Sequence, residues 1–127
     1  MIVLDASVLI AHLDARDGLH DRATQALLSV AATPLGASPL TVAEILVGPA
    51  RAGRRDEAVG ALRTIGIAEI PLPTDASTRL AELRARSGLK LPDCCVILAA
   101  ETAPADAVLT FDERLAAEAV RRGFVAA

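Results

Sequence analysis

Aromatic residues are almost absent from this chain. Its 127 residues include two Phe and no Trp or Tyr, although 53% of the residues are hydrophobic. The core must therefore be built from Ala, Leu, Val and Ile, which suits helices packed closely on a parallel sheet. This apolar content excludes a disordered chain, because enough surface can be buried to offset chain entropy. Without Trp or Tyr, no evident platform exists on which single-stranded bases could stack.

A basic surplus is missing as well. Thirteen Lys and Arg residues face 16 Asp and Glu, giving a formal net charge of -3, and Lys90 is the one lysine. Proteins that bind nucleic acid along a broad basic groove usually carry an excess of positive charge. The composition therefore argues against such a groove, although a nucleic acid bound at a local site stays open.

Cysteines and leader-like segments are also scarce. Cys94 and Cys95 are sequence neighbours, which rarely reach disulfide geometry, and two residues are too few for a zinc site. We interpret them as small, buried core residues. The apolar N-terminal run is broken by Asp5 and lacks a basic flank, so it predicts neither a signal peptide nor a membrane-spanning helix. A cytoplasmic location without membrane contact is expected.

Strand and helix patterns alternate along the whole chain. Apolar runs predict strands at residues 2–5, 34–38, 67–72 and 107–111, with a short last strand at 124–125. Helical spacing predicts helices at 6–15, 20–30, 41–48, 54–65, 75–87, 91–103 and 112–122, and Gly48-Pro49 is expected to break or kink the third. The sequence thus predicts one α/β domain over residues 1–127. Its mostly parallel sheet of about four to five strands is covered by helices on both faces.

Four carboxylates fall where one edge of this sheet is expected. Asp5 ends the first strand, Asp112 follows the strand at 107–111, and Asp93 stands at the start of a helix. Glu44 lies one turn into the helix after the second strand, within an apolar run. Because the helices start where the parallel strands end, all four can converge on that edge. A carboxylate in apolar surroundings is costly unless it is paired or bound to metal.

No Arg or Lys in the sequence is evidently placed to neutralise these acids. A group of oxygen ligands without His or Cys favours a hard cation, Mg²⁺ or Mn²⁺, and the chemistry that follows is hydrolysis of a phosphodiester. A structural alternative stays open for Asp5, Asp93 and Asp112, since an acid at a helix start often serves the helix end. Glu44 has no such explanation.

Four short motifs around these acids resemble those of the PIN-domain family. They are IVLDASVL at 2–9, AEI at 43–45, LPDCCVI at 91–97 and LTFDERL at 109–115, and their order and spacing agree over nearly the whole chain. The short, single-domain form is similar to a VapC-type toxin of a type II toxin–antitoxin pair. The resemblance implies a Mg²⁺-dependent endoribonuclease, with Mn²⁺ as a substitute, RNA as substrate and a cognate antitoxin as inhibitor.

The resemblance also implies roles for individual residues. Asp5, Glu44, Asp93 and Asp112 match the catalytic, metal-binding quartet of the family. Ser7 and Thr110 match hydroxyl positions beside the first and last acids, where they either orient carboxylates or serve a helix start and a turn. Two departures, Leu115 in place of a frequent aromatic and the cysteine pair after Asp93, are interpreted as packing changes.

Other features have both a functional and a structural interpretation. Arg51, Arg54 and Arg55 form the densest basic cluster, suited to RNA phosphates or simply to a solvated helix start. Arg84, Arg86, Arg121 and Arg122 are interpreted as surface charges, and His12 and His20 as surface or packing residues. Apolar stripes at 6–15 and 20–30 offer a surface for an antitoxin helix or for the homodimer that we expect, and core packing explains them equally well.

Alternatives from other classes fit less well. A receiver-like signalling or binding module needs an acceptor Asp after its third strand and a late Lys, but here that strand ends in Pro71-Leu72-Pro73 and Lys90 precedes the wrong element. A haloacid-dehalogenase-type phosphatase needs a second Asp at the position of Ser7. A PIN domain that binds without cutting remains as a third alternative. With the quartet set aside as metal ligands, 12 acids face 13 bases, so the net charge does not exclude RNA.

Overall fold

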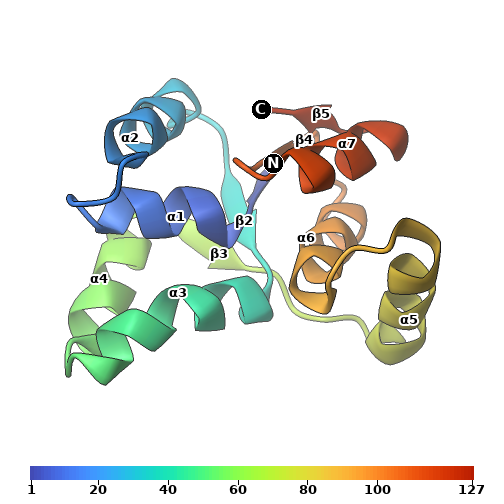
Figure 1. Cartoon of the computed structure of the whole chain (residues 1–127), viewed down its shortest axis with the longest axis horizontal. Helices are drawn as coiled ribbons and strands as arrows, with labels where there is room; N and C mark the ends of the chain where they lie inside the picture. The colour runs from blue at the N-terminus through green and yellow to red at the C-terminus, as the bar shows by residue number, and fades with distance from the viewer.

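A wholly parallel, five-stranded sheet lies between two layers of helices in the computed structural model, which describes residues 1–127 (Figure 1). The strand order is β3-β2-β1-β4-β5. The strands are β1 Ile2–Leu4, β2 Leu35–Ala37, β3 Ile67–Glu69, β4 Ala107–Leu109 and β5 Val125–Ala126. In the centre, Val3 pairs with Gly36 on one side and with Val108 on the other. The predicted α/β class and parallel sheet are confirmed.

The helices divide between the two faces of the sheet. They are α1 Ala6–Leu13, α2 His20–Ser29, α3 Pro39–Arg51, α4 Arg55–Ile65, α5 Ala76–Ser87, α6 Leu91–Thr102 and α7 Glu113–Arg121. The layer of α1 to α4 lies on the left in Figure 1, and the layer of α5 to α7 on the right. Ile2 and Leu4 pack into the first layer and Val3 into the second, because successive side chains of a strand point to opposite faces.

The strands are shorter than the sequence predicts. The segment at 67–72 is a strand only as far as Glu69, and the Ile70 amide then donates to the Ala37 carbonyl at 2.8 Å. Pro71 and Pro73 have no N–H with which to extend the ladder. β3 lies at the edge of the sheet, where such an early end leaves no neighbour unpaired.

Helix α3 differs from the prediction at both ends. It begins at Pro39 rather than Thr41, because the Ser38 hydroxyl accepts a hydrogen bond from the Leu40 amide and Pro39 occupies the first turn. The predicted break at Gly48-Pro49 is wrong, since the helix continues to Arg51. Pro49 stands in the last turn, so its missing N–H removes a single hydrogen bond just before the helix ends.

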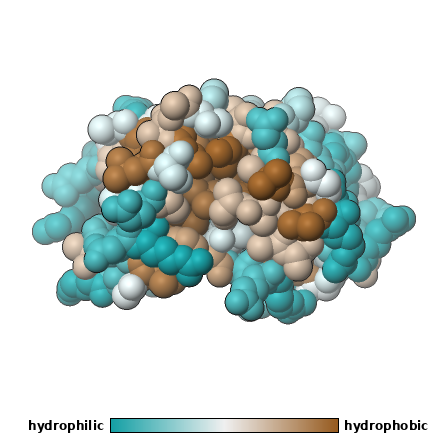
Figure 2. All heavy atoms as spheres, turned by 90° about the horizontal axis from the view of Figure 1, so that it is seen from above, coloured by the Kyte–Doolittle hydropathy of each residue, from teal (hydrophilic) through white to brown (hydrophobic).

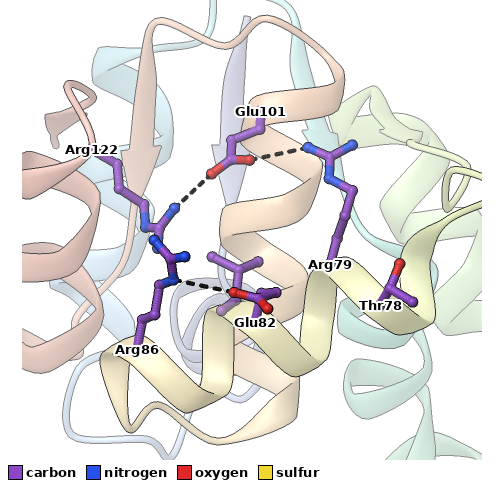
Figure 3. A pocket seen from close by; sticks show the side chains of 7 residues that line it. Thr78, Arg79, Glu82, Arg86, Glu101 and Arg122 are labelled. Atoms are coloured by element: carbon purple, nitrogen blue, oxygen red, sulfur yellow. Dashed lines mark hydrogen bonds and ion pairs between the residues drawn. The ribbon is translucent and has the colours of Figure 1, made fainter.

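A network of ion pairs joins α5, α6 and the end of α7 (Figure 3). Glu101 on α6 accepts from Arg79 and from Arg122, both at 3.1 Å. Arg122 also donates to the buried carboxylate of Glu118 at 2.9 Å, and Arg121 donates to the same carboxylate at 2.7 Å. Arg79, Glu101 and Arg122, together with the pair of Arg86 and Glu82, line a pocket of about 270 Å³. The charged side chains that line this pocket already have ion-pair partners, so we interpret it as a structural contact between helices.

Two of the predicted surface charges, Arg121 and Arg122, therefore belong to this network, and Arg122 is not a surface charge. Arg84, Arg86 and Arg121 are exposed, as predicted, but the side chain of Arg122 is only 27% exposed. The position of Arg122 in the sequence indicates a helix C-terminus. Nothing in the sequence predicts its contact with Glu101 on another helix.

An apolar surface extends over α2, α7 and β5. The most exposed large apolar side chains are Leu28, Val125 and Val120, which belong to these three elements. The elements face the viewer in Figure 2, where hydrophobic atoms gather within a hydrophilic rim. β5 is an edge strand with one unpaired side. Self-association stays a prediction. None of the helices is both long enough and apolar enough to span a bilayer.

Replacing Arg122 with Ala is expected to lower the free energy of unfolding by about 1–3 kcal/mol, because buried Glu118 would keep only one, exposed partner. Arg86→Ala is the matched control, since it removes an exposed pair with Glu82 and should cost less than about 0.5 kcal/mol. Urea unfolding measures both, and equal losses would contradict the structural role of Arg122.

Candidate functional site

Asp5 lies at the centre of the candidate site, at the end of β1. It is 8% exposed, and its Oδ2 accepts hydrogen bonds from the hydroxyls of Ser7 at 2.7 Å and Thr110 at 2.8 Å. Asp5 occupies the N-cap position of α1, but its side chain makes no capping hydrogen bond. The side-chain cap interpretation of Asp5 is therefore wrong. Its Oδ1 makes no hydrogen bond and is free for a ligand.

The two hydroxyls each make a second contact. Ser7 Oγ accepts from the Phe111 amide at 3.1 Å, and Thr110 Oγ1 accepts from the Asp112 amide at 3.0 Å. Because each hydroxyl donates to Asp5 and accepts from the chain after β4, together they lock the β1–α1 connection to the β4–α7 connection. These contacts correspond to the orienting alternative for Ser7 and Thr110.

Asp112 and Asp93 stand at the starts of two helices. Asp112 Oδ1 accepts from the amides of Arg114 at 2.9 Å and Leu115 at 3.1 Å, so one oxygen caps α7 and the other makes no hydrogen bond. Asp93 lies in the first turn of α6, half-buried, and its carboxylate makes no hydrogen bond. The helix-cap interpretation thus holds for one oxygen of Asp112 and leaves the other free.

Glu44 is exposed on α3, which corrects the expectation that its apolar surroundings bury it. On the helix, Thr41 and Ile45 face the core while Ala43 and Val47 join Glu44 on the exposed side. An apolar run in sequence is spread around the helix, so it encloses a residue only if every side of the helix is covered.

The four carboxylates are electrostatically coupled. Partial burial, and then the charges of Asp5 and Asp93, raise the pKa of Glu44 above its ordinary value. Partial burial, and then the charges of Asp5 and Asp112, raise the pKa of Asp93. Like charges raise a carboxyl pKa in this way only when they lie close together. Asp5 and Asp112 follow the carboxyl ends of the neighbouring strands β1 and β4, and α3 and α6, which carry Glu44 and Asp93, begin on the same side of the sheet.

Two cations that lie beside this edge were not identified from the sequence. The charges of Lys90 and Arg114 lower the pKa of Asp93 and so partly offset the effect of the neighbouring acids. Their positions, three residues before Asp93 and two after Asp112, were the only available signals. The predicted basic cluster lies elsewhere, at the turn from α3 to α4, where Arg55 pairs with Asp56 at 3.2 Å and Arg54 shares a groove with Glu44.

The chemistry of the donor set fits a hard divalent cation. No three His, Cys, Asp or Glu side chains are arranged so that they could already hold an ion. The free donors are Oδ1 of Asp5, one oxygen of Asp112, and the carboxylates of Asp93 and Glu44, all of them oxygen. A cation there would also relieve the repulsion that raises two of their pKa values.

The histidines and cysteines have packing roles, as predicted. His12 and His20 stack with ring centroids 6.0 Å apart, and they contact Thr24 Oγ1 and the Ala11 carbonyl. Cys94 and Cys95 are free, buried thiols, and burial raises the pKa of each.

A comparison with family models identifies the family of this fold. The model described as PIN domain matches residues 2–120. The chain belongs to the PIN-domain family. Domains of this family are nucleases, which agrees with the acidic edge. No curated protein matches the sequence.

Several solved structures share the PIN fold of this chain. A toxin–antitoxin complex from Klebsiella pneumoniae is 25% identical, with a TM-score of 0.77, over 92% of this chain and 91% of that chain. VapC20 of Mycobacterium tuberculosis, a toxin that cleaves the sarcin–ricin loop, is 19% identical, with a TM-score of 0.73, over 98% and 97%. VapBC2 of Rickettsia felis, bound to a DNA fragment from its promoter, is 14% identical, with a TM-score of 0.69, over 100% and 98%.

Asp93→Asn is expected to raise the Tm of the metal-free protein near neutral pH, because it removes one of the repelling charges. A carboxyl whose pKa is raised on folding stabilises the fold when protonated, and this contribution is lost as pH rises through the raised pKa. The gain should therefore be present at neutral pH and shrink as pH falls toward the ordinary Asp pKa of about 3.9.

Thermal unfolding with a chelator, followed over pH, measures this effect. Asp21→Asn is the control, since Asp21 also lies in the first turn of a helix, but it is exposed on α2 and is not one of the four acids of the site. Added Mg²⁺ should raise the Tm of the wild type more than that of Asp93→Asn. A Tm for Asp93→Asn no higher than that for Asp21→Asn would contradict the repulsion.

Proposed function

We propose that this PIN domain is a Mg²⁺-dependent endoribonuclease and the toxin of a type II toxin–antitoxin pair. The observation that carries the proposal is the convergence of Asp5, Glu44, Asp93 and Asp112 on one edge of a PIN fold. PIN nucleases generally use divalent metal ions. The similar structures include a toxin that cleaves the sarcin–ricin loop and toxin–antitoxin complexes, which supports RNA as substrate and an antitoxin as partner.

The residues of the site have two roles, which are to hold the cation and to transfer a proton. Asp5 Oδ1, Asp93 and the free oxygen of Asp112 would hold the cation, and the hydroxyls of Ser7 and Thr110 keep Asp5 oriented toward it. A divalent cation, when bound, makes water a better nucleophile and stabilises negative charge on the phosphate.

Glu44 is the residue best suited to act as general base. It is exposed at the edge of the cluster, where its carboxylate is accessible to water, and it accepts no hydrogen bond that would occupy it. It would accept a proton from the attacking water as the new P–O bond forms. The bond to the leaving oxygen breaks on the opposite side of the phosphorus, and that oxygen takes a proton from solvent.

Cleavage of labelled RNA by the purified protein, freed of antitoxin, tests this function. We expect cleavage with Mg²⁺, none with chelator, and a rate more than about 100-fold lower for Asp93→Asn, because even partners that only orient metal ligands are worth about 10–100-fold. Asp21→Asn should cleave like the wild type. Equal cleavage with Mg²⁺, with chelator and by Asp93→Asn would refute the proposal.

A groove beside the site suits the antitoxin. It encloses about 560 Å³ and is lined by residues of α1 and α3, which include the apolar side chains of Ile10, Leu13 and Val47 as well as Glu44. The apolar stripe predicted at 6–15 thus contributes to a surface that is open to a partner. Because the groove shares Glu44 with the carboxylate cluster, an apolar antitoxin segment bound there would also obstruct the site.

Val47→Asp is expected to weaken antitoxin binding by at least about tenfold, since it places a charge in an apolar contact that must be desolvated. Ribonuclease activity without antitoxin should stay within about twofold. Val120→Asp, an exposed position on α7 outside the groove, is the matched control. Calorimetry with the protein encoded by the adjacent gene measures both, and unchanged affinity for Val47→Asp would exclude the groove.

A further inference from the structure

Two cations without ion-pair partners lie beside the carboxylate cluster, in the layer of α5 to α7. Lys90 directly precedes α6, and Arg114 lies in the first turn of α7. Both are exposed, and neither forms an ion pair or a side-chain hydrogen bond, although Asp93 is close enough to sense both charges. Arg114 reaches across to the α5–α6 connection, with Nη2 3.7 Å from where a Cβ at Gly88 would lie.

A third cation lies in the other layer of helices. The guanidinium of Arg22 on α2 lies 4.7 Å from the ring centre of Phe111. Phe111 is the residue between Thr110 and Asp112, and its amide donates to Ser7. Arg22 is exposed and has no ion pair. Packing on an aromatic ring restricts a guanidinium while its N–H groups stay free, which lowers the entropy lost when it binds an anion.

These positions place positive charge on both sides of the negative cluster. Arg22 belongs to the layer of α1 to α4, Lys90 and Arg114 belong to the opposite layer, and the carboxylates lie at the sheet edge between them. The remaining arginines of the opposite layer are occupied: Arg79, Arg86, Arg121 and Arg122 pair with carboxylates, and Arg84 donates to the Leu89 carbonyl. In that layer, Lys90 and Arg114 are therefore the cations that remain free, and both lie beside the carboxylates.

We propose that Arg22, Lys90 and Arg114 bind phosphates of one RNA strand on the two sides of the carboxylate cluster. The inference rests on the proposed ribonuclease function and names the residues that position its substrate. It also changes the expectation for Arg51, Arg54 and Arg55, because those residues lie together at the turn from α3 to α4, on one side of the site. A strand held on both sides presents the phosphodiester between its contacts to the carboxylates.

The salt dependence of RNA binding tests the proposal. Binding of a 5′-labelled single-stranded RNA to the full chain is followed by fluorescence anisotropy in chelator, so that cleavage does not interfere. Each phosphate contact with a single strand contributes about 0.7 to the slope of log K against log salt. The slope should fall by about 1.4 for Lys90→Gln/Arg114→Gln and by about 0.7 for Arg22→Gln, while Arg22→Lys should keep most of it.

Arg63→Gln is the matched control. Arg63 is exposed and unpaired near the end of α4, which leads into the start of β3 and so lies at the opposite edge of the sheet. It should leave the slope unchanged. With Mg²⁺, the double variant should raise the KM for RNA by about tenfold, the effect of about 1.4 kcal/mol, with kcat within about threefold. An unchanged Tm separates substrate binding from a folding defect.

The outcomes separate this inference from the proposed function. Slopes and KM values equal to those of Arg63→Gln would overturn the inference while cleavage by the wild type stands. A fall in slope for Arg54→Gln instead would place the RNA on the α3–α4 turn and also overturn it. If the wild type binds RNA but does not cleave it, the ribonuclease function fails and the slopes alone decide the inference. Absence of both binding and cleavage refutes both.

Discussion

Two hydroxyl groups hold the buried carboxylate of Asp5, and the rest of the site depends on that contact. Ser7 and Thr110 both donate to one oxygen, and both accept from the backbone that follows β4. The first and fourth strands therefore end in a shared hydrogen-bond network. This network fixes the direction of Asp5, positions Asp112 at the start of α7, and brings Phe111 beside the cluster, where Arg22 packs on its ring.

Repulsion between the acids is the force that this rigid frame resists. Burial and neighbouring carboxylates raise the pKa of both Glu44 and Asp93. In the metal-free protein, the packing and hydrogen bonds of the fold must therefore offset the repulsion between these acids. Glu101 and Glu118, by contrast, each pair with two arginines, one of which is Arg122 in both cases. The contrast distinguishes a structural ion network, in which each charge has a partner, from a site whose charges require an added cation and a polyanionic substrate.

Local patterns in the sequence were sufficient for the layout of the fold. Alternating apolar runs and helical spacings predict a parallel sheet with helices on both faces, because parallel strands need crossover connections. The convergence of Asp5, Asp93 and Asp112 follows from the same reasoning, since strand ends and helix starts share one edge. The Gly48-Pro49 break was predicted wrongly, because a proline in the last turn of a helix disturbs little beyond its own hydrogen bond.

Contacts between distant segments needed the tertiary structure. The hydrogen bond from Thr110 to Asp5 spans 105 residues of chain, and no periodicity encodes which hydroxyl meets which carboxylate. The exposure of Glu44 depended on which side of α3 the core covers. The closeness of Arg114 and Lys90 to Asp93 depended on how the ends of α5, α6 and α7 meet. The sequence by itself determined which acids reach the edge, through the directions of strands and helices. The packing of separate helices decided their exposure, their hydrogen bonds and the cations beside them.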